Sequence, residues 1–198
     1  MLTKINIDAS RLDTNERKEK IEQVAVEMHQ IVNSRIFQDK VHTMKKWGET
    51  SKYKDASNQR IYKMIMDGAE TLDPIVDNEM DIFIDDYFSW RRVIGYTKKN
   101  IKTIFVNTRY FDKRGTKLIG SNIMHEYGHK LGFGHDFYAT DRRPFSICYQ
   151  LNNIYEECYD RLFGYTLSKI KVCYRPWYFL GLRKKCYWKE IVNSQEQR

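Results

Sequence analysis

The most regular hydrophobic pattern in the chain lies near its beginning. From about Asn15 to Phe37, apolar residues recur at the three- and four-residue spacing of an amphipathic α-helix. These residues are Ile21, Val24, Ala25, Met28, Ile31, Val32 and Ile36. The pattern predicts one long helix, preceded by a short strand in LTKINID at residues 2–8.

The middle of the chain is patterned less evenly. Residues 40–58 are polar without a clear period, which predicts a large loop, and a shorter helix is predicted from Gln59 to Gly68. Two segments, EMDIFIDDYF at 79–88 and NIKTIFVNTRYF at 100–111, have the alternation or the β-branched content of strands. The intervening GYTKKN at 95–100 is typical of a turn.

Two more helices are predicted in the second half. Apolar residues at helical spacing run through GTKLIGSNIM and beyond it, which predicts a helix from about Thr116 that stops at Gly132. A final helix is predicted from Asn152 to Ile170. No apolar run approaches the roughly 18 residues of a membrane span. The first residues lack the apolar segment of a secretory signal, so we expect a protein that stays in the cytoplasm of the producing cell, with exit by another route as the alternative.

A basic and aromatic segment ends the chain of 198 residues, whose net charge is +8. We predict one domain at 1–168 and a tail at 169–198. The tail's composition suits nucleic acid or another polyanion, while anionic lipid, a partner protein and simple core packing stay as alternatives. Its bases are Lys169, Lys171, Arg175, Arg183, Lys184, Lys185 and Lys189, and Tyr174, Trp177, Tyr178, Phe179, Tyr187 and Trp188 lie among them.

Residues 125–136, HEYGHKLGFGHD, hold three of the chain's five histidines. On the predicted helix, His125 and His129 are four residues apart, so both imidazoles point to one side and can reach one cation. Glu126 is turned away from His125 by about 100°. Its carboxylate is then expected near the open side of that cation, where a general base would act.

A third ligand is available just after the helix. Catalytic zinc takes three protein ligands and leaves a fourth position for water, and His135 can complete such a set if the chain turns back. Gly132 permits the positive φ that ends a helix, and Gly134 adds further freedom. The alternative is that these histidines belong to the core or the surface, as most helical histidines do. A site of this kind can also hold metal without catalysis.

The segment HEYGHKLGFGHD resembles the zinc signature HExxHxxGxxH of the metzincin metallopeptidases, including the aspartate that follows it in several branches. The resemblance implies that His125, His129 and His135 bind zinc and that Glu126 is the general base. It gives Asp136 a supporting role, either orienting a ligand or fixing the turn.

The segments before the motif also resemble this family. MDIFID, GYT and KTIFVN are similar to the metzincin strands that precede the active-site helix, where an edge strand holds an extended substrate by main-chain pairing. The implied fold is a metzincin-like α+β domain. It has a small mixed sheet, a long N-terminal helix, an active-site helix and a C-terminal helix.

One family feature is altered. Metzincins place a methionine-containing turn beneath the zinc, but no methionine follows Met124 in this chain. PFSICYQ at 144–150 resembles that turn, with Cys148 in the methionine's place. Tyr149 is the candidate for the tyrosine that some members bring to the zinc or to the transition-state oxyanion; the alternative is that it packs in the core.

The activity that these observations predict is that of a zinc-dependent metalloendopeptidase, in which Glu126 activates a zinc-bound water to hydrolyse peptide bonds. The cofactor is Zn²⁺ and the substrate a peptide or protein, with peptidoglycan cross-links chemically compatible as well. The alternative is a non-enzymatic, zinc-stabilised binding or assembly protein that works through its basic aromatic tail. Small size, absence of a signal and the basic tail resemble metzincin-like proteins encoded by bacteriophages, which makes association with the virion a further expectation.

Overall fold

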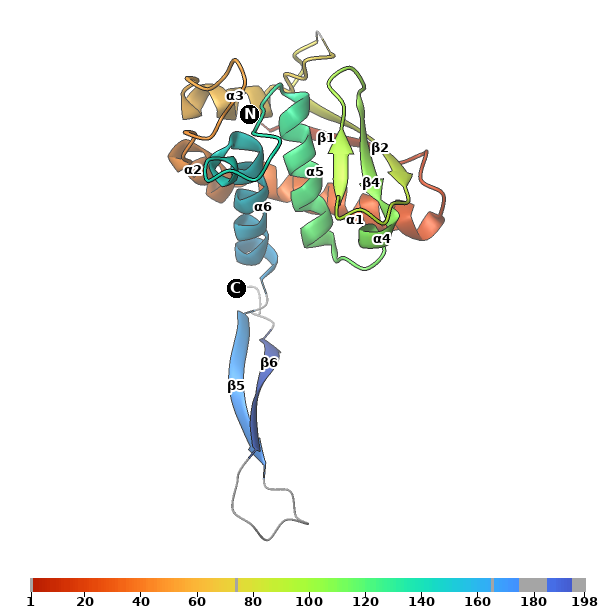
Figure 1. Cartoon of the computed structure of the whole chain (residues 1–198), viewed down its shortest axis with the longest axis vertical. Coiled ribbons are helices and arrows are strands. Elements are labelled where there is room, and N and C mark those ends of the chain that lie inside the picture. The colour runs from red at the N-terminus through yellow and green to blue at the C-terminus, as the bar shows by residue number, and fades with distance from the viewer. Residues whose placement is uncertain (1, 74, 165, 175–184, 194–198) are drawn as a thin grey trace. The chain divides into compact units, whose positions relative to one another are not determined.

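The computed structural model describes residues 2–73, 75–164, 166–174 and 185–193. The chain forms two compact units, Met1–Tyr159 and Asp160–Arg198. The described residues form six α-helices, a four-stranded mixed sheet and a two-stranded sheet (Figure 1). The predicted α+β class is therefore confirmed. Among the residues described, no helix is long and apolar enough to cross a membrane.

The larger sheet is ordered β1-β2-β4-β3. Its strands are β1 (Lys4–Asp8), β2 (Glu79–Tyr87), β3 (Gly95–Thr97) and β4 (Thr103–Asn107). β2 pairs in parallel with both β1 and β4, whereas β3 pairs antiparallel with β4 and forms one edge. Alternate residues of β2 are buried and the residues between them are partly exposed, so one face of the sheet carries the core.

Two segments differ from the pattern-based prediction here. GYT, predicted as the start of a turn, is strand β3, as the family resemblance implied. The second predicted strand segment ends at Asn107, which caps the short helix α4 (Thr108–Phe111) by accepting a hydrogen bond from the backbone N–H of Arg109. The Asn107 amide also donates to the backbone oxygens of Ser89 and Val93, which anchors the loop between β2 and β3.

The prediction of a single long N-terminal helix is wrong, because the helix is interrupted at Asn33 and Ser34. It forms α1 (Asn15–Val32) and α2 (Arg35–Thr43), and α2 extends into the predicted loop. The Asn33 side chain accepts from Thr3 N at 2.8 Å and donates to Thr3 O at 2.9 Å, and the Ser34 hydroxyl caps α2. Both residue types compete with the helix backbone for hydrogen bonds, which an apolar period does not register. The shorter helix is confirmed as α3 (Asn58–Met66).

The helix that carries the motif, α5 (Thr116–Lys130), lies beside the sheet (Figure 1). It contacts α1 and strand β3, and α1 in turn contacts β1. Ile123, Met124 and Tyr127 on α5 are completely buried, as are Val24 and Met28 on α1. The core between helices and sheet therefore fixes α5 next to the edge strand.

The final helix begins and ends earlier than predicted. It is α6 (Ile147–Phe163), and the chain then enters a hairpin of β5 (Thr166–Tyr174) and β6 (Lys185–Asn193). A Cβ at Gly164 would lie 1.5 Å from the carbonyl oxygen of Asp160, so only glycine fits the end of this helix. The part of the predicted helix beyond it is a strand. The basic and aromatic side chains predicted to contact a polyanion lie outside what the structure describes.

Candidate metal centre

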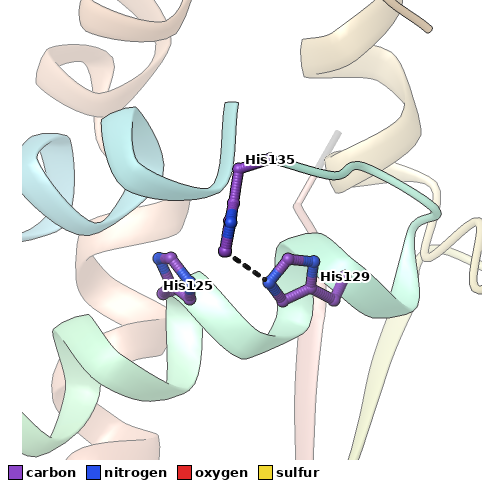
Figure 2. A group of neighbouring side chains, drawn as sticks. All are labelled: His125, His129 and His135. Atoms are coloured by element: carbon purple, nitrogen blue, oxygen red, sulfur yellow. Dashed lines mark hydrogen bonds between the residues drawn. The ribbon is translucent and has the colours of Figure 1, made fainter. Parts of the chain in front are cut away.

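Helix α5 and the loop after it bring three histidines together (Figure 2). His125 and His129 project from the helix, and His135 projects from the loop that follows it. The helix has Leu131 as its C-cap, and Gly132 has a φ of 90°, which turns the chain back. The predicted role of Gly132 is therefore confirmed. The backbone N–H of Phe133 donates to Gly128 O at 3.1 Å and closes the turn.

The three imidazoles are close enough to share one metal ion. Each offers one ring nitrogen, and these atoms all lie within 4.8 Å of one another. Within the described parts of the chain, this is the group of at least three His, Cys, Asp or Glu side chains that could hold a metal ion. The three residues predicted as metal ligands are therefore the three whose ring nitrogens lie together.

Backbone carbonyls select the tautomer of two of the rings. His129 Nδ1 lies 3.0 Å from Phe133 O, and His135 Nδ1 lies 2.9 Å from Asp136 O. A carbonyl oxygen only accepts hydrogen bonds, so each Nδ1 carries the proton. In a neutral imidazole the other nitrogen, Nε2, is then left with a bare lone pair.

These two bare nitrogens face each other. His129 Nε2 and His135 Nε2 are 3.2 Å apart, the contact drawn as a dashed line in Figure 2. Two lone pairs cannot form a hydrogen bond, so the contact is repulsive in the neutral rings unless a cation or a proton lies between them. A shared metal ion would satisfy both nitrogens.

A shared proton is disfavoured by the surroundings. Burial lowers the pKa of both His129 and His135, and burial together with the neighbouring histidines lowers the pKa of His125 to about 3. All three rings are therefore neutral at pH 7 without a metal, which is the form that binds a metal ion.

Glu126 lies next to this group and is 5% exposed. Burial raises the pKa of its carboxyl group to about 7, while Lys130 and the backbone of Thr97 act in the opposite direction. Thr97 belongs to the edge strand β3, so the glutamate lies between the helix and that strand. A carboxylate with this pKa can both accept and release a proton near neutral pH.

The first turn of α6 lies against the histidines. Cys148 is completely buried, and its Sγ lies 3.5 Å from His129 Nδ1, on the side of the ring away from His135. The Tyr149 ring centroid lies 4.5 Å from that of His125 and 5.0 Å from that of His135. Tyr149 is partly exposed and its ring packs against these two histidines.

Asp136 fixes the turn through its side chain. Its Oδ2 accepts a hydrogen bond of 2.6 Å from the Thr140 hydroxyl and lies 3.6 Å from the guanidinium of Arg142. The contact with His135 comes from the backbone oxygen of Asp136 and not from its carboxylate. Of the two roles predicted for Asp136, orienting a ligand or fixing the turn, the contacts of its side chain fit the second.

An open cleft of about 630 Å³ adjoins His129. Its wall includes His129, the loop from Gly132 to Gly134, and Thr97 at the end of β3. Lys52 and Lys99 also line it. A ligand in this cleft would therefore lie beside both the metal centre and the edge strand.

The pattern-based analysis missed Glu49, which is 6% exposed and accepts a hydrogen bond of 2.7 Å from Gly134 N. It lies in the polar segment predicted to be a loop. A single glutamate in such a segment carries no periodic or motif signal, so local sequence offers no means to select it.

The Gly132→Ala variant is expected to lose at least ~1–2 kcal/mol of folding free energy, because an L-residue is strained at this positive φ. A Cβ there would also lie 2.9 Å from Thr71 Cγ2 and 3.1 Å from Tyr53 Cε2. Urea unfolding with a metal chelator present would measure the loss. Gly115→Ala is the control: its Cβ meets no atom within 4 Å and its φ is −74°, so it should lose only the smaller cost of alanine at the N-cap of α5. Equal stability of the two variants would contradict the expectation.

Comparisons with protein-family models, with curated proteins and with solved structures found no match to this chain. Its function is therefore inferred from the geometry of the site.

Proposed function

We propose that the protein is a zinc-dependent metalloendopeptidase of the metzincin type. The observation that carries the proposal is the pair of bare Nε2 atoms of His129 and His135, which face each other at 3.2 Å. Ligand nitrogens in a tetrahedral zinc site, each roughly 2.0–2.1 Å from the ion, lie roughly 3.3–3.4 Å apart. The observed separation fits that value.

The donor set suits a catalytic ion. Three neutral imidazoles are a known zinc ligand set that leaves the fourth position open. The Cys148 thiol faces His129 Nδ1 and not Nε2, so it lies behind the ring and does not compete for that position. When bound, zinc would polarise a substrate carbonyl and lower the pKa of a water molecule towards ~7.

Glu126 is the proposed general base. Its carboxylate accepts a proton from the attacking water and then delivers that proton to the leaving amine. A pKa of about 7 suits both transfers, because the group is then partly ionised at neutral pH. Its position in the helix, one residue after His125, keeps it beside the ligands without making it one of them.

The edge strand supports an extended peptide as the substrate. β3 pairs only with β4 within the described sheet, so its other edge is the proposed binding edge for a peptide main chain, apart from Thr97, whose backbone interacts with Glu126. Thr97, at the end of β3, also lines the cleft beside His129. A peptide paired with β3 would therefore pass the histidines.

Tyr149 is the proposed donor to the oxyanion that forms at the scissile carbonyl. Tyr149→Phe is expected to lower kcat about 10–1,000-fold, because the phenol then no longer stabilises that charge, while KM changes little. Steady-state kinetics on one cleaved peptide would measure the effect. Tyr62→Phe, a tyrosine on α3, is the matched control. Wild-type kcat in Tyr149→Phe would assign the tyrosine to packing alone.

The direct test combines metal content with peptide cleavage. Purified protein is expected to contain one zinc ion per chain and to cleave peptides in a mixed library, and a chelator should stop the cleavage. Zinc without cleavage of any peptide would reject the peptidase and favour a zinc-stabilised binding protein. Absence of zinc after reconstitution would reject the metal centre itself.

A further inference from the structure

A buried carboxylate lies at the point where two segments of the metal centre meet. Glu49 is in the loop of residues 44–57 that joins α2 to α3, and it is 6% exposed. Ser51 N donates to Glu49 Oε1 at 2.9 Å, which holds the carboxylate from within its own loop. A charged group is buried in this way only when its oxygens are satisfied.

Both oxygens of Glu49 accept hydrogen bonds from distant backbone amides. Gly134 N donates to Oε1 at 2.7 Å, and Ile147 N donates to Oε2 at 3.3 Å. Gly134 immediately precedes His135, and Ile147 immediately precedes Cys148, which packs against the His129 ring. One side chain therefore joins the loop of the third histidine to the first turn of α6.

The type of side chain matters for this connection. Ile147 is the first residue of α6, and its N–H has no carbonyl partner within the helix. A carboxylate can accept from both amides at once because both of its oxygens are acceptors, whereas a glutamine would present an NH₂ group to one of them.

The negative charge of Glu49 also favours a cation at the histidines. Three neutral imidazoles leave the charge of a bound dication uncompensated, and a buried negative group nearby offsets it. The Glu49 carboxylate, which accepts a hydrogen bond from Gly134 N beside His135, is such a group.

We infer that Glu49 is a positioning residue of the metal centre, which sets the place of His135 and of the α6 turn so that the three histidines converge on one ion. This inference rests on the proposed zinc site. According to this inference, Glu49, which lies outside the HEYGHKLGFGHD segment, contributes to the affinity of the protein for zinc.

The test is the zinc affinity of Glu49→Gln and Glu49→Asp, measured by competition with a chromophoric chelator. Both variants are expected to bind zinc about 10–100-fold more weakly than wild type, as is typical when a residue that holds a metal ligand in place is changed. Aspartate keeps the charge but is too short to reach both amides. Glu22→Gln, an exposed glutamate on α1, is the matched control and should bind as wild type does.

A second measurement separates positioning from general stability. Co²⁺ in place of zinc gives a visible absorption spectrum that depends on ligand geometry, and this spectrum should change in both Glu49 variants and not in the control. Circular dichroism in chelator checks that each metal-free variant is folded, and Glu49→Asp carries the test if Glu49→Gln is not.

The outcomes distinguish the two proposals. Zinc binding by wild type with equal affinity and an equal Co²⁺ spectrum in folded Glu49 variants would overturn the inference and leave the proposed function intact. A wild-type affinity for zinc in Glu49→Asp alone would show that charge and not positioning is what matters. Absence of zinc binding by wild type would overturn both proposals.

Discussion

Replacing His129 with alanine is expected to remove zinc from the protein, from one ion per chain to less than about a tenth, because two histidines alone rarely hold the ion at micromolar concentrations. His129 is the central ligand of the set, since its Nε2 already faces that of His135. Plasma mass spectrometry of the purified variant would measure the loss. His42→Ala, an exposed histidine on α2, is the control and should keep its zinc.

The same variant tests the argument from lone pairs. In the metal-free wild type, the two Nε2 atoms repel each other, so removing one of them relieves that repulsion while it also removes packing. The metal-free His129→Ala protein should therefore unfold within about 1 kcal/mol of the metal-free wild type in urea, a small cost for a largely buried side chain. Full zinc content in His129→Ala would show that the histidines do not form the site.

Glu126→Gln is expected to lower kcat/KM for peptide cleavage about 10²–10⁴-fold and to leave zinc content unchanged. Glutamine has the shape of glutamate but cannot accept the proton of the attacking water. The residue is buried and its charged form is disfavoured there, so the neutral amide should not destabilise the fold. Steady-state kinetics and metal analysis on one preparation would measure both quantities, with Glu22→Gln as control. A variant that cleaves at the wild-type rate would remove Glu126 from the mechanism.

The pH dependence of the wild type follows from the same group. The base is active when ionised, and burial raises its pKa to about 7, so kcat/KM should increase with pH until the carboxyl group is deprotonated. A cation at the histidines favours the ionised form, so it would move this rising limb of the profile of kcat/KM against pH to lower pH. The residual activity of Glu126→Gln should lack the limb. A profile of kcat/KM against pH for both proteins would check this, and an identical limb in the variant would assign it to another group.

Local spacing is sufficient to predict much of the candidate site. His125, Glu126 and His129 are placed by the geometry of one helix, and the φ of 90° at Gly132 is a conformation that glycine adopts without strain. The direction of the chain after the helix is also a local property. For these reasons the three histidines could be selected from the sequence before their distances were known.

Other elements were mispredicted because short or mixed signals are ambiguous. β3 has three residues, too few to show a period, so GYT was typical of a turn by composition. The break at Asn33 depends on a hydrogen bond to Thr3, thirty residues away in sequence, while the apolar period continues through it. The strand after Gly164 was assigned to the preceding helix, whose period it happens to extend.

The sequence by itself determined the α+β class, the helix that carries the motif and the identity of the three histidines, because each depends on residues within a few positions of one another. Only the tertiary structure decided what surrounds them. The contacts of Glu49 with Gly134 and Ile147 join residues 85 and 98 positions apart, and the cleft beside β3 combines four separate segments. Such contacts arise from packing the whole core, and no local period or spacing encodes them.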